Sequence, residues 1–236
     1  MVSKDMFSQY TTAEKQQLYD ALGEFYSERR KQLFDQLVLN RTRHICVMVE
    51  DIYQSHNASA VLRSCDCFGV QDIHVVEQHN RFNPNSEVAM GSDKWLDVFK
   101  YKHTLEAYDT LRRQGYQIIA TTPHENDMMI DAIDITRPTV LVFGTELTGL
   151  TLEAIDHADG YAKIPMYGFT ESYNISVSAA LSLFSVTERM RKDPQLHWQL
   201  SNDEQLELKL RWSIQTIKEG EQVLKNIAER LFGATR

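Results

Sequence analysis

The stretch IPMYGFTESYNISVSAALSLF, residues 164–184, begins at the end of an apolar segment and runs into a helix rich in small residues. Between these two parts lie Gly168 and the polar run ESYN, residues 171–174. Asparagine is a preferred N-cap, so the sequence predicts that the helix starts directly after Asn174. Strand, polar loop and helix in this order are typical of a ligand-binding edge in an α/β sheet.

The same alternation of strand and helix extends upstream. Short apolar runs predict strands at 45–50, 73–77, 116–122, 139–144 and 161–165. Helical patterns lie between them at 57–68, 104–114 and 151–158. The segment 78–95, which contains NRFNPNS, is expected to be a loop. This alternation predicts an α/β domain with a mainly parallel sheet and helices on both of its faces.

Both ends of the chain are predicted to be helical. A helix is expected over 11–38, with Thr11 and Glu14 as a capping box. A second is expected over 202–231, with Asn202 as its N-cap. Its apolar residues form a narrow seam that needs a partner helix, either the N-terminal helix or a second copy of the chain.

We therefore divide the chain into three parts. Residues 1–44 are expected to form an N-terminal helical extension, residues 45–190 the α/β domain and residues 191–236 a C-terminal helical extension. Neither an internal repeat nor a Pro/Gly-rich linker is visible between them.

The composition indicates an ordinary water-soluble protein. Of the 236 residues, 42% are hydrophobic and 25% are charged, and the sequence has no apolar run long enough to cross a bilayer. The N-terminus lacks an apolar signal core. The three cysteines form neither a disulfide framework nor a pattern with zinc-ligand spacing. We expect a cytoplasmic protein without a metal site and without membrane contact.

The net charge of −8 does not favour nucleic acid as a partner, but the charge is unevenly distributed. Residues 46–187 hold nine Lys or Arg and nineteen Asp or Glu, whereas both ends are nearly balanced. Basic clusters at the two ends have two equally good explanations, solvated helix faces or an RNA-binding surface. If RNA binds there, the candidate contacts are Arg29, Arg30, Lys31, Arg41 and Arg43.

Common nucleotide-binding motifs are absent from the sequence. No G-x-G occurs, which excludes the usual dinucleotide fingerprint. The run GTELTGLT, residues 144–151, has the glycine spacing of a phosphate-binding P-loop. However, Leu150 stands where the lysine is needed, and Glu146 would repel phosphate. Binding of a nucleoside triphosphate is therefore not expected.

Several predicted strands instead end in small and polar residues. Because the carboxyl ends of parallel strands share one edge, Glu50, Thr121, Gly144 and Pro165 should lie along the same crevice. A flat, largely apolar cofactor with one polar edge would suit such a pocket. Taken singly, Asn57, Glu146 and Ser172 could equally be an N-cap, a surface acid and a turn residue.

Three segments resemble, in order, the three motifs of the SpoU branch of the SPOUT RNA methyltransferases. They are HNASAVLRSCDCFGV (56–70), LVFGTELTGL (141–150) and IPMYGFTESYNISVSAALSLF (164–184). The matching positions are Asn57, Arg63, Gly69, Gly144, Glu146, Gly149, Pro165, Met166, Ser172 and Asn174. Tyr173 departs from the family, which usually has leucine there, and can reshape the pocket.

The resemblance implies a fold, a cofactor and a set of site residues. Family members bind S-adenosylmethionine in a deep trefoil knot and act as homodimers whose sites include residues of both subunits; periodicity alone would not predict a knot. The implied catalytic residues are Asn57, Arg63, Glu146, Ser172 and Asn174. The implied cofactor contacts are Thr121, Gly144, Ile164, Met166 and Tyr173.

The implied reaction is methyl transfer to a ribose 2′-hydroxyl. It requires alignment of the two reactants and removal of one proton. An arginine side chain stays protonated in proteins, so we assign Arg63 to positioning and oxyanion stabilisation and leave the proton acceptor open. Asn57 and Glu146 are expected to hold Arg63 in place.

The substrate is implied to be tRNA. The helical extensions, without an added N-terminal RNA-binding domain, are similar to those of family members that methylate the D-loop guanosine at tRNA position 18. Ribosomal RNA or another tRNA ribose is an alternative target. A non-catalytic RNA-binding module on the same fold is a second alternative, although the motif residues that such a module would have lost are present.

Overall fold

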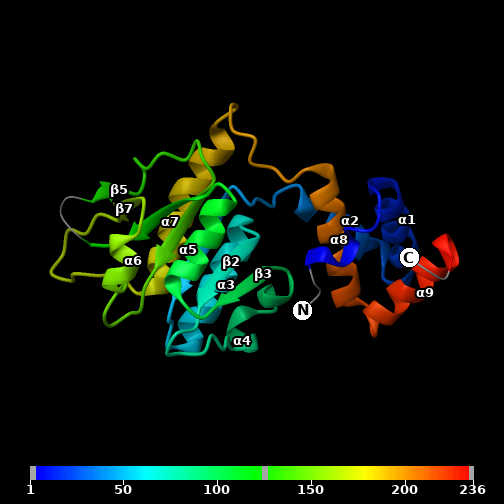
Figure 1. Cartoon of the computed structure of the whole chain (residues 1–236), viewed down its shortest axis with the longest axis horizontal. Coiled ribbons are helices and arrows are strands. Elements are labelled where there is room, and N and C mark those ends of the chain that lie inside the picture. Colours follow the sequence, from blue (N-terminus) through cyan, green and yellow to red (C-terminus); the bar gives the residue numbers. More distant parts are fainter. Residues whose placement is uncertain (1–3, 124–126, 234–236) are drawn as a thin grey trace. The chain divides into compact units, whose positions relative to one another are not determined.

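A computed structural model describes residues 4–123 and 127–233 of the chain. The chain divides into two compact units, which we call the central unit and the terminal unit (Figure 1). The central unit consists of residues 42–198. The terminal unit combines the residues before 42 with those after 198, so it contains most of both predicted helical extensions, whereas residues 42–44 and 191–198 belong to the central unit.

The central unit contains a parallel sheet of seven strands in the order β3-β2-β1-β6-β4-β7-β5. The strands are β1 (Ile45–Glu50), β2 (Asp72–Val76), β3 (Asp97–Tyr101), β4 (Gln117–Thr121), β5 (Met128–Met129), β6 (Thr139–Phe143) and β7 (Gly160–Lys163). The prediction of a parallel α/β sheet is confirmed. Sequence reasoning missed β3 and β5 because both are edge strands with little apolar signal, the first half-exposed and the second only two residues long.

The helices of the central unit are α3 (Ser55–Phe68), α4 (Ser86–Ala89), α5 (Thr104–Arg113), α6 (Leu152–Asp156) and α7 (Ile175–Lys192). The predicted loop 78–95 contains α4 and the short 3-10 helix η3 (Ser92–Lys94). Helix α3 ends as predicted, because Gly69 adopts the left-handed conformation with a φ of 75°. Helix α7 begins as predicted, because the side chain of Asn174 accepts a hydrogen bond from the backbone N–H of Ser176.

Helices cover both faces of the sheet, as the alternation of side chains along β1 demonstrates. Val47 and Val49 join the core that contains residues of α3 and α7. Cys46 and Met48 join a second core, with residues of α5 and α6. A strand buried on both faces reads as a continuous apolar run, which explains ICVMVE at 45–50.

The terminal unit is helical, but each predicted long helix is divided. The segment 11–38 forms α1 (Thr12–Leu22), the 3-10 turn η2 (Gly23–Phe25) and α2 (Glu28–Val38). The Thr11–Glu14 capping box is present. The break arises because the Ser27 side chain accepts from the backbone of Arg30 and starts a new helix.

The C-terminal segment forms α8 (Asn202–Thr216) and α9 (Gly220–Phe232) rather than one helix. The N-cap of α8 is Ser201, in a capping box with Glu204, and not Asn202. An extended Ile217 and a left-handed Glu219 separate the two helices. Leu210, Ile214 and Leu224 of the predicted seam pack with α1 residues, so the N-terminal helix is the partner.

Candidate active site

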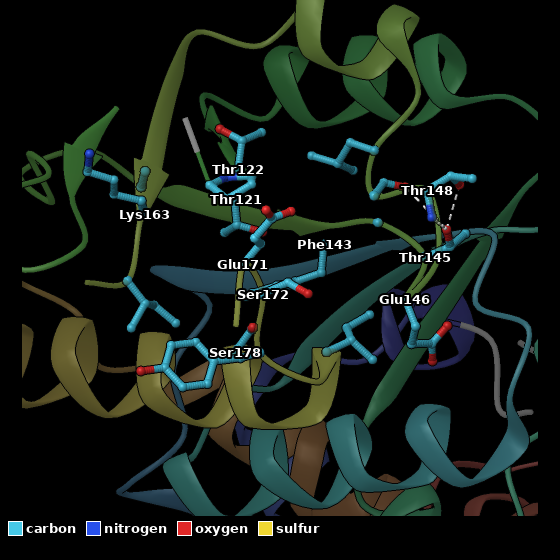
Figure 2. Close-up of a pocket in the computed structure, with 18 of the residues that line it drawn as sticks. Thr121, Thr122, Phe143, Thr145, Glu146, Thr148, Lys163, Glu171, Ser172 and Ser178 are labelled. Atoms are coloured by element: carbon cyan, nitrogen blue, oxygen red, sulfur yellow. Dashed lines mark hydrogen bonds between the residues drawn. The ribbon is translucent and has the colours of Figure 1, made fainter. Parts of the chain in front are cut away.

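A cavity of about 500 Å³ lies at the carboxyl edge of the sheet. Thr121 follows from β4, Gly144 from β6 and Ile164 from β7, so three predicted strand ends line one space. Residues 171–173 and one side of α7 complete the wall (Figure 2). Its mixture of apolar and polar side chains can accept a ligand with an apolar body and polar edges.

The loop after β6 is closed by its own backbone. Thr145 and Gly149 exchange two backbone hydrogen bonds of 2.9 and 3.1 Å, and the Thr145 hydroxyl lies 2.8 Å from that of Thr148 (Figure 2). A Cβ atom added to Gly144 would lie 2.1 Å from the carbonyl carbon of Gly149. The glycine at 144 is therefore required by this close approach of two backbone segments.

Three predicted catalytic residues form a chain of hydrogen bonds beside the cavity. The amide of Asn174 donates to the side-chain oxygen of Asn57 over 3.1 Å, and the amide of Asn57 donates to the carboxylate of Glu146. Asn57 is 3% exposed and lies in the first turn of α3, so it is not the N-cap. Since Asn174 also accepts from Ser176, the orientation of each amide is fixed.

Arg63 is not part of this hydrogen-bonded chain. It lies six residues after Asn57 on α3, so its side chain leaves the helix about 120° away from that of Asn57. Its side chain is exposed, and within residues 4–123 and 127–233 it makes no hydrogen bond or ion pair. The expected pairing of Arg63 with Asn57 and Glu146 is absent within one copy of the described chain.

Ser172 and the predicted cofactor contacts line the cavity. The hydroxyl of Thr121 donates to the carbonyl of Val142 over 2.7 Å, and the hydroxyl of Tyr173 donates to the backbone carbonyl of Pro165 over 3.2 Å. Ile164, Met166 and Ser172 also belong to the lining.

Glu50 lies at the predicted carboxyl edge, at the end of β1, but it does not line the cavity. Its carboxylate is buried and accepts hydrogen bonds from the hydroxyl of Thr104 and from the backbone and hydroxyl of Thr151. Glu50 therefore fixes the start of α6 instead of facing the cavity.

The predicted RNA contacts divide into two sets. Arg29 is exposed on α2, Arg30 is half-buried there, and Lys31 pairs with Asp20 over 3.3 Å. In contrast, Arg41 is 4% exposed and lies over the ring of Trp212.

Arg43 also has a structural environment. It pairs with Asp72 and Asp97 over 3.1 and 3.0 Å at the amino edge of the sheet, opposite the cavity. The basic residues at 40–44 gave no indication of these acidic partners, because the partners come from β2 and β3. The predicted RNA contacts that are accessible to solvent are therefore residues 29–31.

Sequence reasoning did not single out Lys163, Ser178 and Ser182, which line the cavity. The two serines are one helical turn apart in α7 and lie within the third motif, so this spacing was the available signal. The described residues contain no cluster of His, Cys, Asp and Glu that could hold a metal ion. None of their helices combines the length and apolar character needed to cross a bilayer.

The sequence is similar to a protein family and to individual proteins of known name. Residues 44–184 match the model of the SpoU rRNA methylase family. Over 197 residues the chain is 38% identical to the tRNA (guanosine(18)-2′-O)-methyltransferase of Borreliella burgdorferi, covering 84% of this chain and 90% of that protein.

Solved structures agree with the sequence comparison. The TrmH/SpoU tRNA modifying enzyme of Aquifex aeolicus superposes with a TM-score of 0.74 at 27% identity, over 81% of this chain and 98% of that one. The SpoU methyltransferase AviRb of Streptomyces viridochromogenes, in complex with the cofactor AdoMet, has a TM-score of 0.59 at 22% identity, covering 67% of this chain and 65% of that one. The second likeness concerns the fold alone.

Proposed function

Because the chain belongs to the SpoU rRNA methylase family, we propose that it methylates the 2′-hydroxyl of guanosine 18 in tRNA, with S-adenosylmethionine as the methyl donor. The observation that carries this proposal is the hydrogen-bonded chain Asn174–Asn57–Glu146 beside the cavity. Its members come from three motifs far apart in sequence. The choice of nucleotide rests on the relative from Borreliella burgdorferi, whose name specifies it and whose length the match almost covers.

The residues of the cavity fit this donor. S-adenosylmethionine would supply a methyl group on a sulfonium, from which a neutral thioether departs readily, so the protein must align the reactants and remove one proton. The apolar lining residues Phe143, Ile164 and Ile175 suit a flat ring system. The carboxylates of Glu146 and Glu171 suit the positive charges of the donor.

Within the site, each residue has a proposed task. Asn57 and Asn174 hold the Glu146 carboxylate in one position. Arg63 contacts the target ribose and stabilises negative charge that develops on the 2′-oxygen. Ser172 completes the site from the loop before α7, while Thr121, Gly144, Ile164, Met166 and Tyr173 surround the donor.

The exposed position of Arg63 supports a homodimeric enzyme, in which the guanidinium serves a site built with the second copy. Helix α7 also leaves Val177, Leu181 and Phe184 at 43%, 41% and 58% exposure, an apolar face that a second copy would cover. Family membership further supports a trefoil knot in the C-terminal part of the central unit. A tRNA substrate supports a cytoplasmic location.

The direct test is incubation of the purified protein with unmodified tRNA and a donor labelled on the methyl group. We expect label at the 2′-oxygen of guanosine 18, located by nuclease mapping, and none on a transcript whose nucleotide 18 carries 2′-deoxyribose. Ribosomal RNA should be tested in parallel, because the matching family model carries that name. Label on ribosomal RNA alone would replace the proposed substrate, and binding of RNA without label would favour the non-catalytic module.

A further inference from the structure

Two serine hydroxyls of α7 lie in the wall of the cavity. Ser182 is fully buried, and its Oγ has no hydrogen-bond partner among the residues that the structure describes. Ser178, one turn earlier, is half-buried, and Figure 2 labels it in the wall of the cavity. Within the same described part of the chain, its hydroxyl makes no hydrogen bond either.

This situation differs from that of comparable hydroxyls in this protein. In helices, Ser and Thr side chains commonly donate to the carbonyl four residues earlier. Six of the residues that the structure describes do so, over 2.7 to 2.9 Å: Ser59, Ser64, Thr110, Thr187, Ser213 and Thr216. Thr187 lies in α7 itself, one turn beyond Leu183. The helix therefore permits this bond, and Ser182 does not form it.

A buried hydroxyl without a partner costs free energy in the ligand-free protein, so it needs an explanation at this site. The cavity supplies one, because a ligand that fills it can accept or donate the missing hydrogen bond. The ligand group facing Ser182 should be neutral, since a hydroxyl alone does not compensate a buried charge. Ile130 and Ile164, which also line the cavity, favour a flat ring over a charged chain.

We propose that Ser182, assisted by Ser178, hydrogen-bonds the polar edge of the adenine ring of the bound methyl donor. This inference rests on the proposed function, because it assumes that S-adenosylmethionine occupies the cavity. It makes Ser182 a specificity-determining residue for the base. The carboxylate-bearing part of the lining, which includes Glu146 and Glu171, is left for the positively charged end of the donor.

The test compares two ligands by isothermal titration calorimetry. S-adenosylhomocysteine carries both adenosine and the amino acid, whereas methylthioadenosine carries adenosine alone. The variant Ser182→Ala should weaken both ligands by the same factor, about tenfold, which corresponds to one lost hydrogen bond. Ser178→Ala should have a smaller effect in the same direction. The matched control is Thr187→Val, which removes a buried hydroxyl already satisfied by the helix and should leave both affinities unchanged.

A second measurement separates binding from folding. Loss of an unsatisfied buried hydroxyl should leave the melting temperature of ligand-free Ser182→Ala equal to or above that of the wild type. Unchanged affinity for both ligands would overturn the proposal, and weakening of S-adenosylhomocysteine alone would place the contact at the amino-acid end instead. If the wild type binds neither ligand, the proposed function fails, and this inference fails with it.

Discussion

Asn174 donates a hydrogen bond of 3.1 Å to the side chain of Asn57, a residue 117 positions earlier in the chain. Asn174 also caps α7 through its side-chain oxygen, so one residue both starts a helix and positions the site. This dual use explains why a polar run precedes a helix built for burial. The side-chain amides of Asn57 and Asn174 both donate hydrogen bonds in this chain. Because Asn57 donates to its carboxylate, Glu146 has a fixed orientation beside the cavity.

The contact between Asn57 and Glu146 can be tested by exchanging donor and acceptor. Asn57→Asp places a second carboxylate against Glu146 and should lower the free energy of unfolding by about 1 to 3 kcal/mol. Glu146→Gln alone should cost less, because its carbonyl can still accept from Asn57. The double variant restores one donor and one acceptor and should be more stable than Asn57→Asp in urea denaturation. A double variant as unstable as Asn57→Asp would contradict the observed contact.

The close backbone approach at Gly144 predicts a large effect from a single methyl group. In Gly144→Ala the new Cβ would lie 2.1 Å from Gly149 and 2.2 Å from the backbone of Leu150, so the loop must open. We expect a loss of about 3 kcal/mol or more of stability and loss of donor binding. Gly168→Ala is the control, because its Cβ would have no neighbour within 4 Å. Equal stability of both variants in thermal denaturation would refute this account of the loop.

Local patterns predicted the parts of the fold in which one residue decides the outcome. Gly69 ends α3 because its backbone adopts the left-handed conformation, and Asn174 starts α7 because its side chain accepts a hydrogen bond from the first turn of the helix. The edge strand β3 was missed because its pairing with β2, and not its own composition, makes it a strand. The ion pairs of Arg43 were not predicted for a related reason, since its partners Asp72 and Asp97 are close only after the sheet has formed.

The site could be predicted as a set of residues but not as a geometry. The motifs indicated Asn57, Glu146 and Asn174, and the fold brings them together. Helical phase places Arg63 on another side of α3, which a linear motif does not display. The sequence spacing of Ser178 and Ser182 indicates a shared side of α7, but an unsatisfied hydroxyl at Ser182 is recognised only when the surrounding acceptors are known.

Arg63→Ala should lower methyl transfer more than about 100-fold, because it removes the group assigned to charge stabilisation in the transition state. Affinity for S-adenosylhomocysteine should change little, since Arg63 is exposed and does not line the cavity. Arg113→Ala removes the same charge from the end of α5 and should retain full activity. Single-turnover rates measure methyl transfer by both variants, and calorimetry measures their affinity for S-adenosylhomocysteine. Full methyl transfer by Arg63→Ala would contradict the role assigned to Arg63.

The terminal unit should respond to pH through Lys15, which pairs with Asp203 and Glu207 over 2.6 and 2.8 Å. Burial lowers the pKa of Lys15, but hydrogen bonds and charge attraction from both acids outweigh burial and raise it above its ordinary 10.5. The hydrogen bond from Lys15 lowers the pKa of Asp203 below its ordinary 3.8.

The sign of the pH effect follows from these two shifts. Because the pKa of Lys15 is raised in the folded protein, its ion pairs stabilise the fold below pH 10.5, and this stabilisation is lost as the pH rises further. Because the pKa of Asp203 is lowered, its ion pair stabilises the fold above pH 3.8, and this stabilisation is lost in more acidic solution. The stability difference between the wild type and Lys15→Met should therefore be constant between these limits and shrink outside them. Urea denaturation across this range measures it, and a difference independent of pH would contradict the proposed linkage.

Residues 29–31 are the predicted RNA contacts that remain at the surface of α2. Arg29→Glu, Arg30→Glu and Lys31→Glu together should weaken tRNA binding, because each basic group that neutralises a phosphate releases counterions. The slope of log affinity against log salt should become shallower by roughly two, since each lost phosphate contact contributes about 0.7 to 0.9. The control reverses Lys218, Lys225 and Arg230, three exposed charges at the other end of the terminal unit's sequence. Filter binding over a series of salt concentrations measures both slopes, and equal slopes for the two triple variants would place the RNA away from α2.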